Sequence, residues 1–505
     1  MLIPLQFPPG FLKNGTPYQR RGRWIDGNLV RWYQGSIRAI GGWLRRTTFT
    51  GVEIPALIAD ATLEAIRDGF AWRSLSQEQN LVFGSNLKLY HISQIGAVTD
   101  VTPVGVTTSA KDALTASGYG LGPYGLGAYG VENDLGAFEP VPPNRWAFDN
   151  FGEILLTCQR GVGPLYELAI GTLVLSSVTN APSACQDVIV TDQRIVFTLG
   201  ADMEPRLAKW SDVSNRTQWT AAVSNQAGDY TLPGSGKLLR ALKVLNQIFI
   251  LGEADAYVAQ YLGPPYVFGF ELAARNCGPL SAEAIAGTEK FALWWGNRQF
   301  WSFDGAVANL PCDVMEFLQR DVDFTQKSKI TAFSNQQYSE VWWLYQSLST
   351  TTTEVDSYVA YNYVDNTWWT GRLNRTVGVD IGTLGTPTMV RADGVIFLHE
   401  LKGVATGAET PYIESGGVEV AGGNKNMAVR YIFPDTEASG DVTMTMYGKQ
   451  FPSDTEYTYG PYVYNNPTPT RALGREIRFR FDGASVNFEV GVMRADVAPV
   501  GGGYR

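Results

Sequence analysis

Histidine is the side chain that most often transfers protons near neutral pH, and this chain has only two, His91 and His399. A catalytic triad built on histidine, or a metal site with several imidazole ligands, therefore has almost nothing to draw on. His91 falls in a stretch that we expect to be a β-strand, where a hydrogen-bonded structural role is the simpler interpretation. His399 stands beside Glu400, but neighbours along a strand point to opposite faces, so they make a poor acid and base.

Two closely spaced carboxylate pairs could do the work of a glycosidase, which places two acids on either side of a sugar bond. They are Asp321 with Asp323, and Asp202 with Glu204. Nothing in the sequence connects either pair to a pocket, so solvated surface charge is the default interpretation. A glycan-binding or glycan-cleaving function stays open as an alternative, because Trp side chains could also stack on sugars.

Phosphate and thiol chemistry have equally little support. The pattern Gly-x-Gly-x-x-Gly begins at Gly120 and again at Gly125, but neither copy lies between a strand and a helix, as a phosphate site requires. The four cysteines have no paired metal-ligand spacing and are too sparse for a disulfide framework. We expect free buried thiols at Cys158, Cys185, Cys277 and Cys312. We therefore expect a protein that is not an enzyme and holds no cofactor or metal.

The composition favours short strands and many turns over helices. Among 505 residues there are 54 Gly and 26 Pro, with 24 Tyr, 24 Phe and 14 Trp, which is typical of an all-β chain. The chain contains no run of 18 apolar residues and does not begin with a signal-peptide pattern. We therefore expect a soluble protein made in a cytosol.

The stretch from Lys290 to Cys312 contains the clearest element, an apolar strand, a Gly-Asn-Arg turn and an aromatic strand. Similar units recur, and their apolar runs begin at Leu81, Ile154, Ile195, Ile248, Phe291, Val341 and Val395, which gives spacings of 73, 41, 53, 43, 50 and 54 residues. Most of these spacings are close to the 40 to 50 residues of a propeller blade. We predict a β-propeller over residues 51–405, in which this hairpin is the inner pair of strands of one blade and its aromatic residues are core.

Residues 1–50 form a basic N-terminal arm. They contain eight Lys or Arg and one Asp, a net charge of +7, so the rest of a chain with net charge −9 carries −16. A basic arm on an acidic body suggests docking on an acidic partner, and the candidate contact residues are Arg20, Arg21, Arg23, Arg45 and Arg46. Short strands in the arm could instead complete the last blade, because a ring of blades lacks free edges only if its ends are joined. An arm lying on the body is the other interpretation.

Two further segments differ from the predicted blades in composition and sequence pattern. Residues 104–145 are an insertion in which Tyr119, Tyr124 and Tyr129 recur every five residues among glycines. So much Gly cannot build a core, and regularly spaced Tyr suits a subunit or partner contact, although a merely flexible loop is the alternative. Residues 406–505 alternate cleanly between apolar and polar positions, which predicts a small C-terminal β-sandwich-like domain.

Several of these motifs resemble one family of viral proteins. They are WIDGNLVRWYQGSIRAIGGW in the arm, the Tyr-Gly loop, GPL at 278–280, WWGNRQFWSFDG, LPC, VWWLY, YVAYNY and the Gly-rich tail that ends in Arg. Together they resemble the tail nozzle or hub proteins of short-tailed bacteriophages, also described as packaged-DNA stabilisation proteins. The likeness runs over most of the chain.

This resemblance implies a structural virion protein in the tail, assembled in the host cytoplasm. It implies a propeller-bearing subunit of a homo-oligomeric, six-fold ring beneath the portal and adaptor proteins, with tail fibres or spikes as further partners. Such a ring closes the DNA channel and lets double-stranded DNA pass at infection, without stable membrane insertion, cofactor or catalytic residues. The acidic composition fits that role, because a surface without cations leaves phosphates free to slide.

Overall fold

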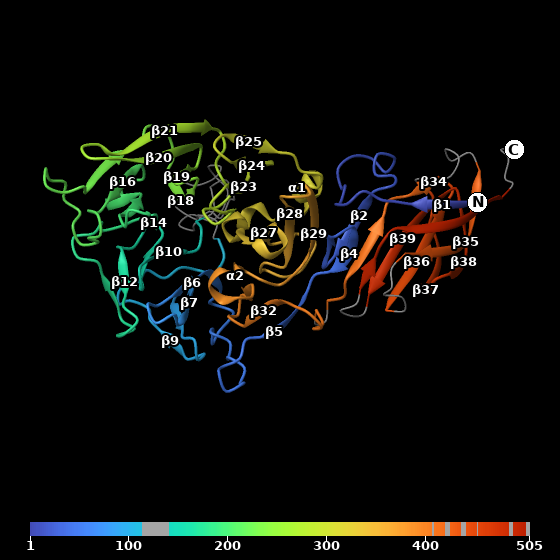
Figure 1. Ribbon diagram of the computed structural model, residues 1–505, viewed down its shortest axis with the longest axis horizontal. Coiled ribbons are helices and arrows are strands. Elements are labelled where there is room, and N and C mark those ends of the chain that lie inside the picture. Colours follow the sequence, from blue (N-terminus) through green and yellow to red (C-terminus); the bar gives the residue numbers. More distant parts are fainter. Residues whose placement is uncertain are drawn as a thin grey trace, which may run out of the picture.

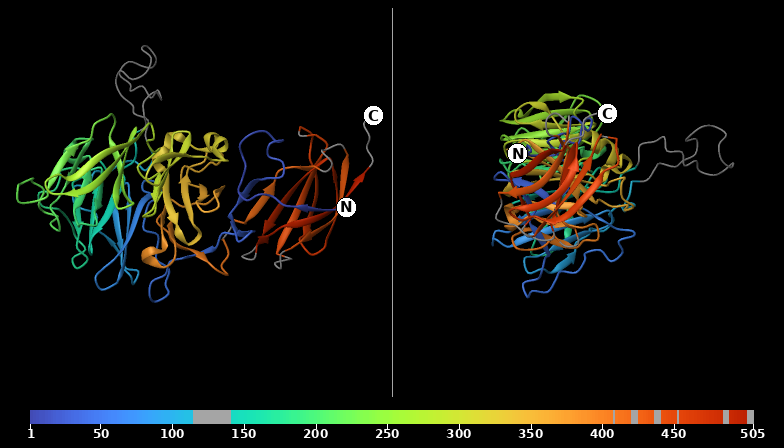
Figure 2. Two further views of the ribbon diagram at one scale, coloured as in Figure 1. Left: turned by 45° about the horizontal axis from the view of Figure 1, so that its top comes forward. Right: turned by 90° about the vertical axis from the view of Figure 1, so that its right-hand side faces the viewer.

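The computed structural model describes residues 1–113, 141–406, 409–419, 425–435, 441–451, 453–483 and 488–500, and nearly all of its regular structure is β-strand. The chain forms two β domains at opposite ends of an elongated body (Figures 1 and 2). The described helices are short: α1 (Met315–Asp321), α2 (Ile381–Leu384) and the 3-10 turns at Ala201–Met203, Phe324–Lys329 and Gln336–Tyr338.

The larger domain is a propeller of seven four-stranded antiparallel sheets, as the repeat predicts. The first blade consists of β6 (Ile66–Arg73), β7 (Gln79–Ser85), β8 (Leu89–Ile92) and β9 (Val98–Asp100). The second consists of β10 (Trp146–Phe151), β11 (Ile154–Gln159), β12 (Tyr166–Leu168) and β13 (Leu175–Ser177). The third consists of β14 (Asp187–Val190), β15 (Val196–Leu199), β16 (Leu207–Trp210) and β17 (Gly228–Thr231).

The fourth blade consists of β18 (Leu238–Val244), β19 (Gln247–Gly252), β20 (Asp255–Gly263) and β21 (Val267–Arg275). The fifth consists of β22 (Ile285–Gly287), β23 (Ala292–Gly296), β24 (Gln299–Phe303) and β25 (Val307–Leu310). The sixth consists of β26 (Thr331–Asn335), β27 (Glu340–Tyr345), β28 (Ser357–Asn362) and β29 (Thr367–Arg372). The seventh consists of β30 (Val377–Val379), β31 (Thr388–Val390), β32 (Ile396–Leu401) and β5 (Gly42–Arg45). The N-terminal arm therefore supplies the outermost strand of the last blade, and the ring is closed.

The hairpin between Lys290 and Cys312 is the middle pair of its blade, and the prediction that it is the inner pair is wrong. The inner strand is β22, only three residues long and poor in bulky side chains, because inner strands converge on the axis. The second strand, β23, is buried along its whole length, since neighbouring blades cover both of its faces. Its tryptophans, Trp294 and Trp295, are fully buried as core. In the seventh blade the apolar run near Val395 belongs to the third strand rather than the second.

The smaller domain is a β-sandwich that residues 406–505 do not build alone. Its distal sheet has the order β1 (Leu2–Leu5), β41 (Met493–Val500), β35 (Asn426–Pro434) and β38 (Thr468–Gly474). Its proximal sheet has the order β2 (Trp24–Asn28), β33 (Tyr412–Ser415), β39 (Glu476–Gly483), β36 (Val442–Lys449) and β37 (Tyr457–Val463), with β34 (Val418–Glu419) also on β39. Strands β1 and β2 come from the arm, so the arm completes both sheets of this domain as well.

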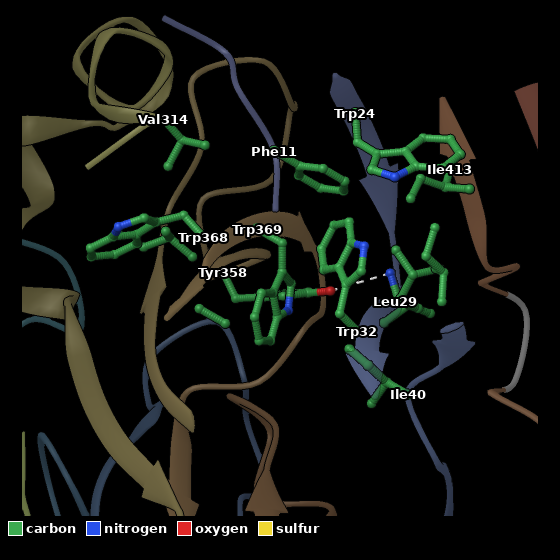
Figure 3. Packing of buried hydrophobic residues seen from close by; sticks show 14 of the residues in the cluster. Phe11, Trp24, Leu29, Trp32, Ile40, Val314, Tyr358, Trp368, Trp369 and Ile413 are labelled. Carbon is green, nitrogen blue, oxygen red and sulfur yellow. Dashed lines mark hydrogen bonds between the residues drawn. The ribbon is translucent and has the colours of Figure 1, made fainter. Parts of the chain in front are cut away.

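The arm also forms the junction between the domains. Strands β3 (Val30–Tyr33) and β4 (Ser36–Ala39) make a hairpin that pairs with β40 (Glu489–Val490), while β2 lies beside β29, the outer strand of the sixth blade. Trp32 contacts Trp369 with ring centroids 6.0 Å apart, and Leu29 donates its backbone N–H to the hydroxyl of Tyr358 at 3.2 Å (Figure 3). One apolar cluster thus runs from the propeller through the arm into the sandwich, and a large apolar interface holds domains rigidly together.

Replacing Trp32 with alanine tests this junction. Trp32 is 8% exposed, so its truncation should leave a cavity and lower the free energy of unfolding by about 3–5 kcal/mol. Because the arm belongs to both domains, we expect one shared denaturation transition to shift, measured by tryptophan fluorescence and far-UV circular dichroism. Leu44→Ala in the same arm, at a side chain 54% exposed, is the control and should change stability by no more than about 0.5 kcal/mol. Two separate transitions would show that the arm does not couple the domains.

Candidate functional site

The arginines proposed as partner contacts in the first half of the arm mostly contact this chain. Arg21 Nη2 lies 2.6 Å from Glu419 Oε1 of β34, and its guanidinium stacks 3.7 Å from the ring of Tyr18. Arg23 Nη2 lies 3.7 Å from a carboxylate oxygen of Asp313, before α1. These pairs tie the loop before β2 to the sandwich on one side and to the propeller on the other.

The remaining arm arginines have different surroundings. Arg20 Nε donates to the carbonyl oxygen of Asn14 at 3.3 Å, within the same loop. Arg45 Nη1 lies 2.6 Å from Glu53 Oε2, an exposed pair, while partial burial lowers the pKa of Arg46. The five arginines therefore do not form one patch, because the first three lie at the junction and the last two lie at the closure of the seventh blade.

Tyr119, Tyr124 and Tyr129 lie outside the described residues, but both ends of that segment are anchored. At one end, the side-chain amide of Gln326 accepts from the N–H of Ala113 at 2.9 Å and donates to the carbonyl of Ala113 at 3.1 Å. At the other end, Asn144 donates its backbone N–H to Ser109 Oγ at 2.8 Å and its side-chain Nδ2–H to the carbonyl oxygen of Thr107 at 2.7 Å. Ala113 and Val141 both border the mouth of the propeller channel.

That mouth is a cavity of about 720 Å³ on the face where the inner strands begin. Its charged groups are paired in an alternating arrangement. Arg160 Nη1 lies 3.0 Å from Asp187 Oδ1, and Arg240 Nη1 lies 2.7 Å from Glu283 Oε1, to which Arg160 also donates. Burial acts to raise the pKa of Glu283, but the fields of Arg240 and Arg160 outweigh it and lower that pKa to about 2.

These pairings leave the mouth poorly suited to glycoside hydrolysis. A general acid must hold a proton near neutral pH, which Glu283 does not. Burial raises the pKa of Asp68 against the pull of Arg145, but both carboxylate oxygens of Asp68 accept from Arg145 Nε, at 2.8 and 3.0 Å, and one also accepts from the N–H of Trp146 at 2.8 Å. Both carboxylate oxygens of Asp68 are therefore already engaged within the chain.

Both histidines are buried and bonded within the chain. His91 Nε2 lies 2.9 Å from Asn80 Oδ1, and burial lowers the pKa of His91 to about 4. Arg375 Nε donates to His399 Nε2 at 3.0 Å, and burial with this cation holds the pKa of His399 well below its usual value. Within the described ranges, no group of three or more His, Cys, Asp or Glu is arranged to hold a metal ion, and the four cysteines are free.

One buried ion-pair network, centred on Arg31, was not predicted from the sequence. Arg31 of β3 is buried between the sixth and seventh blades, with Nε 2.9 Å from Glu340 Oε1 of β27 and Nη2 2.5 Å from Glu400 Oε1 of β32. The guanidinium also lies 3.7 Å from the ring of Tyr338. In the sequence Arg31 alternates with the apolar residues Val30 and Trp32, so strand periodicity places it on the opposite face, and no local pattern indicates that it is buried. Arg31 is therefore the polar anchor of the arm in the propeller.

The comparisons with known proteins concern the fold alone. No family model matches the chain, and no curated protein does. A catalytically inactive virginiamycin B lyase from Staphylococcus aureus is similar at 7% identity and a TM-score of 0.42, over 69% of this chain and 98% of that one. PorZ of the type-IX secretion system of Porphyromonas gingivalis is similar at 12% identity and 0.34, over 78% and 50%. A Lactobacillus plantarum protein is similar at 9% and 0.36, over 83% and 99%. At these values no activity can be transferred.

The Arg31 triad predicts a pH dependence of stability. Two carboxylates share one cation, and burial raises the pKa of Glu340 to about 7. A carboxyl group whose folded pKa exceeds its unfolded value of about 4.3 binds more protons when folded, so stability falls as pH rises from about 4.5 to 7. The size of this change is on the order of 3 kcal/mol.

Glu340→Gln should abolish this fall, because the amide does not ionise. The measurement is the urea midpoint between pH 4.5 and 8 for wild type and variant, and the readout is the slope with pH, since the amide also loses one acceptor for Arg31. Glu53→Gln, at an exposed carboxylate, should keep the wild-type slope. Parallel curves for wild type and Glu340→Gln would refute the assignment.

Proposed function

We propose that this protein is a structural subunit of a short bacteriophage tail: the nozzle or hub ring that continues the channel of the portal and adaptor, retains packaged DNA and passes it at infection. The observation that carries the proposal is the path of the arm, which completes both sheets of the sandwich and the last blade of the propeller. A body locked in this way suits a mechanical element. The sequence motifs that resemble nozzle proteins supply the identity of the assembly.

In this proposal DNA does not run through the propeller's own axis. The space between the inner strands is a cavity of about 220 Å³, walled by side chains from six of the blades. Such a cavity holds a small group of water molecules, each of which occupies about 30 Å³. The duplex would instead pass through the centre of a homo-oligomeric ring, between subunits that contact one another head to tail.

The surroundings of that ring follow from the same proposal. The portal and adaptor lie above it, tail fibres or spikes attach to it, and the ring belongs to the virion tail after assembly in the host cytoplasm. Among the described residues, no helix is long and apolar enough to cross a membrane. The chain acts without catalysis, by holding a rigid wall around the DNA.

A glycan-binding or glycan-cleaving tail protein is the alternative. It needs a pocket with available carboxylates, whereas Glu283 and Asp68 at the channel are held by arginines. A glycan array with the purified chain separates the two functions, because the structural subunit should give no binding above background.

Negative-stain electron microscopy tests the assembly directly. The purified protein, mixed with the portal–adaptor complex of its virion, should form rings coaxial with the portal, since a nozzle must continue that channel. The protein alone and the portal alone are the controls. Free monomers in the mixture, with the portal intact, would contradict the proposed function.

A triple variant tests whether the arm's arginines contact the adaptor or a neighbouring subunit. If they do, Arg20→Gln/Arg21→Gln/Arg23→Gln should reduce ring formation on the portal at least tenfold while the monomer stays folded, measured by circular dichroism and particle counts. Glu419→Gln breaks the internal pair of Arg21 without removing the arginine, and it should assemble normally. Equal loss in both variants would assign these arginines to the junction of this chain instead.

A further inference from the structure

The distal sheet of the sandwich has an outer face that points away from the propeller, at the end of the elongated body (Figures 1 and 2). Three arginines lie on three adjacent strands of this face: Arg494 on β41, Arg430 on β35 and Arg471 on β38. All three are exposed, and among the described residues none has an ion pair or a hydrogen bond through its side chain. This differs from the arm, where Arg21, Arg23 and Arg31 are paired within the chain.

A β-bulge presents the central arginine to solvent. Val429 pairs with Val497 of β41 while Tyr431 pairs with the next residue, Asp496, so Arg430 is the extra residue of β35. A bulge turns side chains away from strict alternation. As a result both Arg430 and Tyr431 are exposed, and Tyr431 is 43% exposed.

The register gives the spacing of the three cations. Arg494 pairs with Phe433, three residues along β35 from Arg430, and Arg471 precedes Ala472, the partner of Val429. With strands about 4.8 Å apart and a rise of about 3.3 Å per residue, the array measures about 10 Å across the strands and about 10 Å along them, so its outermost pair, Arg494 and Arg471, is about 14 Å apart. The exposed Tyr431 lies within it.

Few opposing charges lie on the described part of this face. Asp496 is paired with the N-terminal ammonium at 3.1 Å, and Asp435 follows the end of β35. Lys425 precedes the start of the same strand, at the opposite end from Asp435. Arg430, Arg471 and Arg494 therefore have no ion-pair partner among the described residues, on a chain whose formal net charge is −9, and they concentrate positive charge on one face of the sandwich.

This arrangement suits the closely spaced phosphates of a nucleic-acid backbone. The guanidinium is a planar fork that donates two parallel hydrogen bonds to a phosphate, and tyrosine hydroxyls commonly donate to the same backbone oxygens. Duplex DNA presents one charge per about 1.7 Å of axis, so an array about 14 Å across finds phosphates within reach at every register. Contacts of this kind carry no sequence information and permit sliding.

We propose that the outer face of the distal sheet, through Arg430, Arg471, Arg494 and Tyr431, binds the phosphate backbone of double-stranded nucleic acid. The biological role rests on the proposed function: in the tail, this face would be the part of the subunit that contacts DNA. Its weak binding would slow the movement of DNA past a subunit whose net charge is otherwise acidic. The binding itself is a property of the isolated chain and is tested separately from assembly.

The experiment is fluorescence anisotropy of a labelled 30-base-pair duplex with the full chain, from 50 to 200 mM salt. Three phosphate contacts predict a slope of log K against log salt of about −2.7, so affinity should fall about 40-fold over this range. Arg430→Gln/Arg471→Gln/Arg494→Gln should remove most of the binding at 50 mM and flatten the slope. A duplex of unrelated sequence should bind within about twofold, because the contacts are to the backbone.

The matched control is Arg194→Gln/Arg275→Gln/Arg298→Gln, which removes the same charge from exposed propeller arginines that have no ion pair among the described residues. It should bind DNA as wild type does. Equal loss in both triple variants, or unchanged binding in the sheet variant, would overturn the proposal. So would displacement of the duplex by poly-L-glutamate as effectively, per charge, as by unlabelled duplex, since that would indicate an acidic protein partner. If the protein forms rings on the portal but does not bind DNA, the DNA-binding inference is refuted while the proposed function stands.

Discussion

The blades of a propeller pack face to face around an axis, and the ring is held closed when both ends of the chain contribute strands to one blade. In this protein β5 pairs with β32, with Phe397 opposite Arg45 and Leu398 opposite Leu44. The same arm has already placed β1 and β2 in the sandwich before it reaches that blade. The closure of the propeller and the completion of the sandwich are therefore one structural event, and neither domain has all of its strands without the first 45 residues.

Anchoring the arm required a charged group in an apolar junction. Trp32 and Leu29 supply apolar contacts, but Arg31 between them must be buried as β3 crosses the gap between the sixth and seventh blades. A buried cation is tolerated only when it is paired and hydrogen-bonded, which explains why both Glu340 and Glu400 converge on it. Burial is the main cause of the raised pKa of Glu340, and the charge of Glu400, the second carboxylate on the same cation, raises that pKa further.

The parts of the fold that could be predicted are those with a local signal. The second strand of each blade is buried on both faces, so it appears as a continuous apolar run, and the turn after it is short; Ala292–Gly296 is an example. The inner strand Ile285–Gly287 has only three residues and is too short to show a period. Strand β1 pairs with a strand more than 480 residues later, which no local pattern can reveal. The number of Lys and Arg residues identifies the basic arm. It cannot show that Arg21 pairs with Glu419 and Arg23 with Asp313. The bulge at Arg430 likewise depends on the register of three strands, which the sequence does not show. The contact role of Tyr119, Tyr124 and Tyr129 remains a prediction, because these residues lie outside the described part of the chain.

The distribution of paired and unpaired charge separates the two ends of the molecule. Around the propeller axis each guanidinium meets a carboxylate, as Arg145 does with Asp68 and Arg160 with Asp187, so the axis has little net field to attract a ligand. On the distal sheet Arg430, Arg471 and Arg494 have no such partners among the described residues. Uncompensated arginines on a well-ordered sheet are costly only if buried, and here they are exposed, so they cost the fold little and keep their charge available. Association with an anion is therefore expected at the sandwich end rather than at the mouth of the propeller.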